Sequence, residues 1–276
     1  MIKINHIKAC LSIFRIQLAQ SMQYRLAALS SASISIFWAL IEIVVFTVFY
    51  EHAQNSTFSM NGLTLAQVIS YAWIAQVLVP LQPMSIDGEI LSQITSGNVG
   101  IALCRPLTLY GQWFAHTAAG RLGAFWMRGI LTVLAGVLMP AAMRLSGPAS
   151  MPGFFMFLLS AIGAFLLCTS FGMLVTAVRL NITWGEGPTY MLLLLSMVLS
   201  GGYLPLQLWP DALQKLLLYQ PFAGYLDIPV RLYVGSMAWT QGIGAVFLQA
   251  CWTLAFVWAG KALMKRKLKT LIIQGG

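Results

Sequence analysis

Long stretches with almost no charged residues dominate this sequence. The first covers residues 26–50, LAALSSASISIFWALIEIVVFTVFY, and contains a single acid, Glu42. Because an α-helix rises about 1.5 Å per residue, about 20 apolar residues are enough to cross the hydrocarbon core of a bilayer. Similar stretches predict further spans at about 64–83, 120–143, 154–178, 189–208 and 240–262. We therefore predict an all-α membrane protein whose residues 26–276 form one domain of six transmembrane helices.

Charged residues are scarce, and their distribution predicts the orientation. They make up 8% of the chain, whereas 59% of the residues are hydrophobic; soluble domains are about one quarter charged. In a soluble protein, a net charge of +9 would suggest that the chain binds nucleic acid. Here the basic residues flank apolar spans, and the loop 51–62 has no Lys or Arg. The positive-inside rule then places both termini, 84–112 and 179–188 in the cytosol, and no nucleic-acid partner is expected.

The N-terminal segment, residues 1–25, is predicted to be a cytosolic helix lying on the membrane surface. Apolar residues recur at helical spacing while Lys3, Lys8 and Arg15 lie elsewhere; the apolar positions are Ile4, Ile7, Leu11, Phe14 and Leu18. One apolar face beside basic residues is typical of an interfacial helix. The alternative is a plain basic flank of the first span.

The segment 209–239 is apolar, but we do not predict a seventh span there. Charged residues interrupt it, prolines would break its helix, and a seventh span would move the basic C-terminal tail outside. We predict two short re-entrant helices that dip into the outer leaflet with a kink at Pro221. The residues assigned to them are Pro221, Phe222, Asp227 and Pro229.

The polar segment 84–112 contains a stretch rich in turn-forming residues, ITSGNVGIALCRPLT (94–108). Asp87 and Glu89 begin a piece that can form a short helix, and Ser96-Gly97-Asn98 would break it. Pro106 disfavours helix at Arg105. A short helix projecting into the cytosol would suit docking to another protein, although a plain solvated loop explains the composition equally well.

Three ionisable residues fall within or beside predicted spans. Glu42 should face protein or water, because a charge inside the hydrocarbon costs a few kcal/mol. It either lines a pathway, forms an interhelical pair, or reaches water at the outer edge. Arg121 is expected to extend to the cytosolic headgroups. Arg128 lies deeper and is a possible partner of Glu42, although their estimated depths match poorly.

The sequence contains no recognisable catalytic, metal-binding or nucleotide-binding motif. It has no GxxxxGK[ST] phosphate loop, so we do not expect the chain to hydrolyse ATP. The acids and histidines are scattered, and the four cysteines contain no CxxC pair. We therefore predict no catalytic residue, no metal site and no bound cofactor, and no enzymatic activity.

Two motifs, in this order and on this pattern of spans, carry a resemblance. One joins Ser96-Gly97 to Leu103-Cys104-Arg105-Pro106-Leu107. The other is GGYLPLQLWPDALQKLLLYQPFAGYLDIPVRLYVG, residues 201–235. Together they make nearly the whole chain resemble the permease subunits of bacterial type-2 ATP-binding-cassette exporters, the ABC-2 permeases.

The resemblance implies that the chain works in a complex with other subunits. It implies a bacterial inner-membrane permease that forms half of a pathway with a second permease, identical or related, among the membrane lipids. Two separate ATPase subunits would hold ATP and Mg²⁺ and dock on a coupling helix between the second and third spans. The residues assigned to coupling are Asp87, Glu89, Ile90, Ser96 and Arg105.

The resemblance also implies that the first, second and fifth spans line the pathway. Few hydroxyl groups occur there, which favours an amphipathic drug, lipid, peptide or natural product as cargo. The pathway or gating candidates are Glu42, Arg128, Tyr203, Leu204 and Pro205. An ATP-independent channel or secondary transporter, a lipid enzyme and a scaffold without transport remain alternatives.

Overall fold

The computed structural model describes residues 6–53, 63–97, 99–104, 107–181 and 186–269. Every regular element in these ranges is a helix. Four helices are long and apolar enough to cross a bilayer: α2 (Arg25–Ala53), α6 (Leu109–Leu138), α7 (Met151–Asn181) and α11 (Trp239–Leu268). They match the first, third, fourth and sixth predicted spans.

The second and fifth predicted spans correspond to shorter apolar helices, α3 (Leu65–Leu78), which continues into the 3₁₀ turn η1 (Val79–Leu81), and α8 (Gly187–Val198). The 12 residues of α8 rise only about 18 Å, short of the roughly 30 Å hydrocarbon core. Six helices that each cross the bilayer therefore stay a prediction.

The fifth predicted span was too long at its C-terminal end. It was expected to continue to residue 208, but α8 ends at Val198. Gly201 has a φ of 83°, a left-handed conformation that glycine adopts without strain. The chain then reaches Pro205 and the 3₁₀ turn η2 (Leu206–Leu208). Hydropathy alone does not register this change of backbone direction.

The third span was placed too far along the chain. It was expected at about 120–143, yet α6 begins at Leu109, where the Thr108 side chain caps it by accepting from Gly111 N at 3.3 Å. It ends at Leu138, ahead of Pro140, which cannot donate a backbone hydrogen bond. The first turns of α6 contain polar residues, so an average of hydropathy excludes them.

Helix α3 lies at the centre of the bundle. Its residues from Val68 to Leu78 are all buried. It packs against α2, α6 and α10 (Asp227–Val234). Trp73 is fully buried there, and its indole Nε1 donates to Met143 O at 2.8 Å, in the α6–α7 connection. The second predicted span is therefore surrounded mainly by protein.

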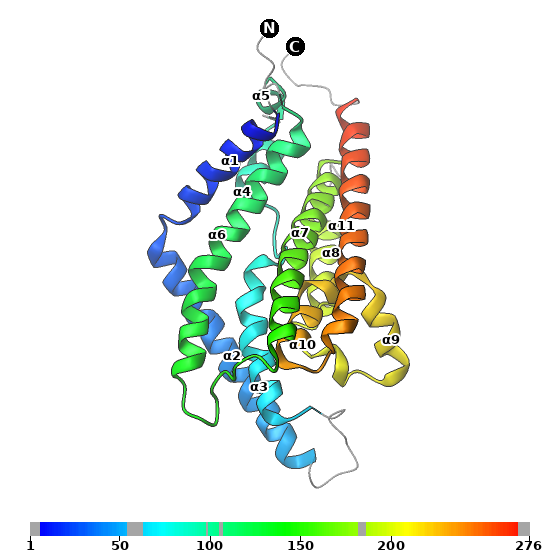
Figure 1. Cartoon of the computed structure of the whole chain (residues 1–276). Helices are drawn as coiled ribbons and strands as arrows, with labels where there is room; N and C mark the ends of the chain where they lie inside the picture. The colour runs from blue at the N-terminus through cyan, green and yellow to red at the C-terminus, as the bar shows by residue number, and fades with distance from the viewer. Residues whose placement is uncertain (1–5, 54–62, 98, 105–106, 182–185, 270–276) are drawn as a thin grey trace.

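Different helices and connections lie at the two ends of the bundle (Figure 1). Helix α1 (His6–Ser21) begins and α11 ends at the same end of the molecule, which we call the terminal end. Two short helices, α4 (Gly88–Thr95) and α5 (Val99–Leu103), also lie there. The α6–α7 connection lies at the opposite end, and α9 (Asp211–Tyr219) and α10 lie in that half of the molecule.

Helix α1 packs along the first half of α6. A Cβ at Gly111 would lie 3.5 Å from Cys10 Sγ, and one at Gly123 would overlap the Ser21 hydroxyl. These glycines let the helices approach closely, and α1 leaves Ile7, Leu11 and Ile16 exposed. That apolar face is compatible with lipid contact, so the interfacial position of residues 1–25 stays a prediction.

The segment 209–239 folds as short helices with a break at Pro221, in agreement with the predicted kink. Helix α9 ends at Tyr219, the 3₁₀ turn η3 (Pro221–Tyr225) follows, and α10 comes next. Seven of the eight residues of α10 are buried, and α10 packs against α7 and α3. This satisfies the requirement that short helices at membrane depth be covered by protein. Their entry into a leaflet stays a prediction.

Candidate functional site

Three adjoining cavities follow α2 from its middle toward the terminal end, and we call them together the groove. The apolar cavity, about 350 Å³, is lined by α2 and the loop after α8. The middle cavity, about 250 Å³, shares Trp38, Glu42 and Tyr203 with it and adds residues of α3 and α6. The inner cavity, about 310 Å³, shares Val79 and Arg128 with the middle one. Because neighbouring cavities share lining residues, the groove is continuous, and α2, α3, α6 and the loop after α8 form its walls.

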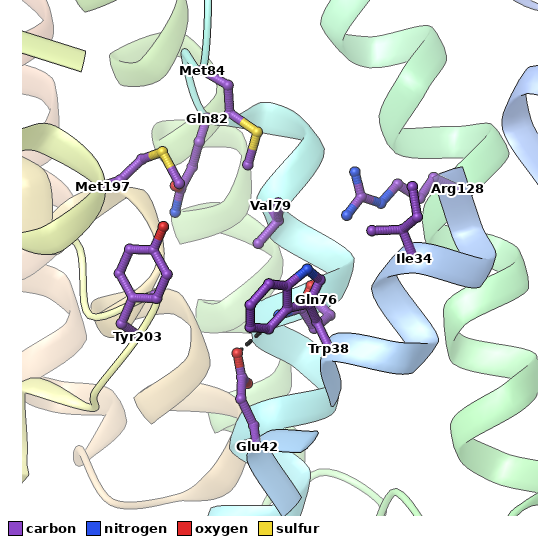
Figure 2. A pocket seen from close by; sticks show the side chains of 11 residues that line it. Ile34, Trp38, Glu42, Gln76, Val79, Gln82, Met84, Arg128, Met197 and Tyr203 are labelled. Atoms are coloured by element: carbon purple, nitrogen blue, oxygen red, sulfur yellow. Dashed lines mark hydrogen bonds between the residues drawn. The ribbon is translucent and has the colours of Figure 1, made fainter. Parts of the chain in front are cut away.

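Glu42 lies at the junction of the apolar and middle cavities (Figure 2). Its Oε1 accepts from the amide Nε2 of Gln76 at 3.0 Å, and Gln76 itself is buried on α3. Glu42 thus lines a cavity and also pairs with a residue of a neighbouring helix, so its role in a pathway stays a prediction. A glutamine in an apolar helix is a signal the sequence contained, but Gln76 was not among the predicted residues.

Arg128 does not form the pair with Glu42 that the sequence suggested. Its Nε donates to the hydroxyl of Ser35, and no ion pair joins it to Glu42 within the described residues. Ser35 and Glu42 are both on α2, seven residues apart, which is about 10 Å along a helix axis. The mismatch in depth therefore decides the outcome, and Arg128 lines the groove between its middle and inner cavities.

Arg121 turns into the protein instead of extending to the headgroups, so that prediction was wrong. Its Nη1 donates to Leu81 O at 2.8 Å and to Cys168 O at 3.4 Å. Gly172 makes the space, because a Cβ there would lie 2.5 Å from Arg121 Nη2. The carbonyl of Leu81, at the end of η1, attracts the guanidinium inward.

The remaining pathway candidates lie in the loop after α8. Tyr203 and Leu204 are exposed and line the apolar cavity, with Tyr203 also reaching the middle one. Pro205 is buried and precedes η2. Two of these three candidates, Tyr203 and Leu204, therefore face the groove.

The second candidate site is the α4–α5 knob, residues 87–104 at the terminal end. Asp87 caps α4, since its Oδ1 accepts from Glu89 N at 3.1 Å and from Ile90 N at 3.3 Å. The imidazole of His116, on α6, lies 3.4 Å from Asp87 Oδ2 and 3.0 Å from Glu89 Oε2. The predicted helix and its break are both present, and Gly97 has a φ of 74° at that break.

The charge of Asp87 is stabilised in this setting. Burial raises the pKa of Asp87, but the hydrogen bond and charge of His116 and the two backbone amides outweigh it. The net pKa lies below the usual aspartate value, so the carboxylate stays charged at neutral pH. No role was predicted for His116, because its partners lie 27 and 29 positions earlier in the chain.

The other predicted coupling residues divide into two groups. Ile90 is buried in a cluster with Leu109 and Trp113, so it anchors α4 on α6, and its part in coupling stays a prediction. Glu89 and Ser96 are exposed. Arg105 lies outside the described residues. The knob is therefore held by its inner face and presents a polar outer face.

Comparison with protein-family models supplies the assignment. The model described as ABC-2 family transporter protein matches residues 36–275. The chain belongs to the ABC-2 transporter family. No curated protein and no solved structure matches the chain. The match covers most of the groove, the knob and the segment 201–235 that carried the resemblance.

In this ABC-2 family protein, the segment after α8 is tied to the core through Asp227. The Asp227 carboxylate is fully buried; its Oδ1 accepts from the Tyr71 hydroxyl at 2.9 Å and from Leu206 N at 3.1 Å. Its Oδ2 lies 3.5 Å from Arg231 Nη1. One side chain thus joins α10, α3 and the loop that carries Tyr203. Tyr71 was not predicted, because nothing local distinguishes it.

Other predicted residues of this segment of the ABC-2 protein are packed. Pro221 opens η3, Phe222 stacks edge-on against Phe171 with ring centroids 5.1 Å apart, and Pro229 is buried in α10. Gln249 of α11, which was also not predicted, donates to Gly224 O at 2.8 Å and to Ser160 O at 3.2 Å. These contacts fix the segment against α7 and α11.

Proposed function

We propose that this ABC-2 family protein is the permease subunit of an ABC exporter, forming half of a pathway that a separate ATPase drives. The groove is one half of that pathway, and a second permease, identical or related, supplies the other. Two ATPase subunits bind ATP and Mg²⁺ and dock on the α4–α5 knob. The chain itself carries out no hydrolysis.

The connection between the knob and the groove is the observation that supports this proposal. His116 joins α4 to α6 through Asp87 and Glu89, and Ile90 is buried between the same helices. Arg121 and Arg128, further along α6, line the groove. A rigid-body movement imposed on α4 therefore passes along one helix to the pathway, which is what coupling to a nucleotide-driven motor requires.

The orientation follows from the basic residues. Lys8, Arg15, Lys265, Arg266 and Lys267 belong to α1 and α11 at the terminal end, whereas Arg144 lies in the opposite connection. We place the terminal end, with the knob, in the cytosol of a bacterium and the chain in its inner membrane. In this arrangement α3 and α8 serve as the second and fifth spans, and α9 and α10 as the re-entrant outer helices.

The groove supports an amphipathic or hydrophobic cargo. Its apolar cavity is lined largely by aromatic and aliphatic side chains, including Trp38, Phe49 and Leu204. Such a lining suits drug-sized apolar molecules and has fewer hydrogen-bonding groups than a sugar site requires. We propose that the direction of transport is out of the cell.

A co-purification experiment tests the proposal. The tagged chain is isolated in mild detergent from its native cells, its partners are identified by mass spectrometry, and ATP hydrolysis is measured. We expect an ATPase with a phosphate-binding loop. Isolation of the chain alone, even after crosslinking, would contradict the proposal and favour an ion-driven channel or transporter.

A matched pair of variants shows where the ATPase docks. Ser92→Arg places a long charged side chain on the exposed face of α4 and should abolish co-purification. Arg144→Glu alters charge at the opposite end, on another exposed residue, and should leave it intact. Equal recovery of the ATPase with both variants would show that the knob is not the docking site.

A further inference from the structure

We infer that the apolar cavity of the groove binds a lipophilic organic cation, with the Glu42 carboxylate as its counter-charge. The inference deepens the proposed function, on which it rests, because a cargo site has meaning only if the groove is a transport pathway. It names the charge class of the cargo, which the hydrophobic lining alone leaves open.

The first argument is the state of Glu42. Among the described residues, Gln76 is its one hydrogen-bond partner, through a single oxygen, and no ion pair neutralises it. Gln76 is neutral, so it orients the carboxylate without cancelling its charge. An acid inside a membrane-spanning helix is costly and normally has a partner or a functional reason. A bound cation would supply the missing partner.

The second argument is the segregation of charge along the groove. Glu42 is the one charged side chain in the described lining of the apolar cavity. Arg128 lines the middle and inner cavities and donates to Ser35, and Arg121 lines the inner cavity and binds backbone carbonyls. The apolar cavity therefore offers a cation an acidic side chain as its partner, and it offers an anion no basic one.

The third argument is the type of apolar surface around the carboxylate. Trp38, Phe49 and Tyr203 line the same cavity and are 47%, 61% and 55% exposed, so their rings are available to a ligand. Figure 2, which draws the lining of the adjoining middle cavity, shows the three residues that both cavities share: Trp38 and Glu42 on α2, and Tyr203 opposite them. The faces of aromatic rings attract organic cations. A volume of about 350 Å³ lies within the range of small-molecule sites, roughly 300–1,000 Å³.

A pair of probes with one shape and opposite charge tests this inference. Tetraphenylphosphonium and tetraphenylborate differ mainly in sign of charge and have no hydrogen-bonding groups. Binding of radiolabelled tetraphenylphosphonium to the purified chain in nanodiscs is measured by equilibrium dialysis, with empty nanodiscs subtracted. We expect saturable binding of tetraphenylphosphonium. Tetraphenylborate, measured in separate samples because the two ions pair with each other, should show no saturable binding.

Three variants test whether the charge of Glu42 itself, and not a general change in the protein, determines binding of the cation. Glu42→Gln keeps an acceptor oxygen for Gln76 and removes the charge, and we expect its Kd to rise at least about tenfold. Glu51→Gln removes an exposed acid near the end of the same helix and should bind as the unaltered protein does. Glu42→Asp, which restores the charge, should recover the preference for the cation.

Two results would overturn the inference: equal affinity of Glu42→Gln and the unaltered chain for tetraphenylphosphonium, or saturable binding of tetraphenylborate, in separate samples, that is as tight as that of tetraphenylphosphonium. Neither requires the ATPase. If the ATPase co-purifies but no cation binds, the cation site is refuted and the permease function stands. If the cation binds but no ATPase is found, the site stands and the proposed function is refuted.

Discussion

His116 on α6 contacts Glu89 on α4, with Nε2 and Oε2 3.0 Å apart. Its other ring nitrogen lies 3.4 Å from Asp87, which caps the same short helix. One imidazole therefore spans two carboxylates at the start of α4. This links the projecting helix to a long helix that lines the groove.

Removal of that link should uncouple ATP hydrolysis from transport. We expect His116→Ala to fold, because the partly exposed pairs that it breaks are worth only about 1 kcal/mol. With the partner ATPase in proteoliposomes, hydrolysis should persist while export falls several-fold. Glu89→Lys, which reverses the charge facing His116, should have the same effect. Export equal to that of the unaltered protein in both variants would contradict the coupling role.

The charge of Asp87 should stabilise the protein only above acidic pH. Its pKa in the folded protein is below the usual value of 3.8, so its stabilising effect is present above that value. The effect is lost as the pH falls through the lowered pKa. Asp87→Asn keeps a capping acceptor and removes the charge. The difference in thermal stability between the two proteins should be present at about pH 5 and should shrink below about pH 4.

Two glycines of α6 provide a paired test of packing. A Cβ at Gly136 would lie 2.9 Å from Cδ2 of the buried Trp73 and 3.2 Å from Leu145 Cβ. Gly136→Ala should therefore destabilise the fold by about 1–3 kcal/mol. At Gly120 no atom lies within 4 Å of an added Cβ. Gly120→Ala should be neutral or slightly stabilising, because alanine favours helix. Thermal unfolding in detergent measures both, and equal effects would refute the packing at Gly136.

Asp227 should be the most sensitive residue of the segment after α8. Asp227→Asn leaves Arg231 facing a neutral partner and should destabilise the protein by about 3–5 kcal/mol, as expected when a buried pair is broken. Tyr71→Phe removes one hydrogen bond to the same carboxylate and should cost only about 1–2 kcal/mol. The two are compared by thermal unfolding in nanodiscs. A larger effect of Tyr71→Phe would mean that the ion pair contributes little.

Several elements could be predicted from the sequence because the relevant signal is local. The apolar stretches of α2, α7 and α11 are long enough to show on hydropathy alone. The break at Pro221 and the turn at Gly97 follow from the backbone chemistry of single residues. Glu42 was singled out for a similar reason, since an acid in an apolar helix needs an explanation, although the sequence left a pathway role, an interhelical pair and a position at the outer edge open.

The beginning of α6 and the direction of Arg121 could not be predicted in this way. The first turns of α6 are polar, yet they are covered by α1 and by the α4–α5 knob, which a hydropathy average does not detect. Arg121 has a long side chain that can reach either headgroups or protein. Arg121 points into the protein because the carbonyl of Leu81, 40 positions away, accepts its hydrogen bond and because Gly172 leaves space for the guanidinium.

Composition and the spacing of apolar residues were thus sufficient to establish a helical membrane protein and most of its long helices, because the cost of exposing a charge or a backbone group to lipid acts residue by residue. The contacts of Asp87 and Glu89 with His116, of Gln76 with Glu42 and of Tyr71 with Asp227 came only from the tertiary structure. Each joins residues from different helices, so it depends on how the helices pack, and helix packing is a property of the whole chain.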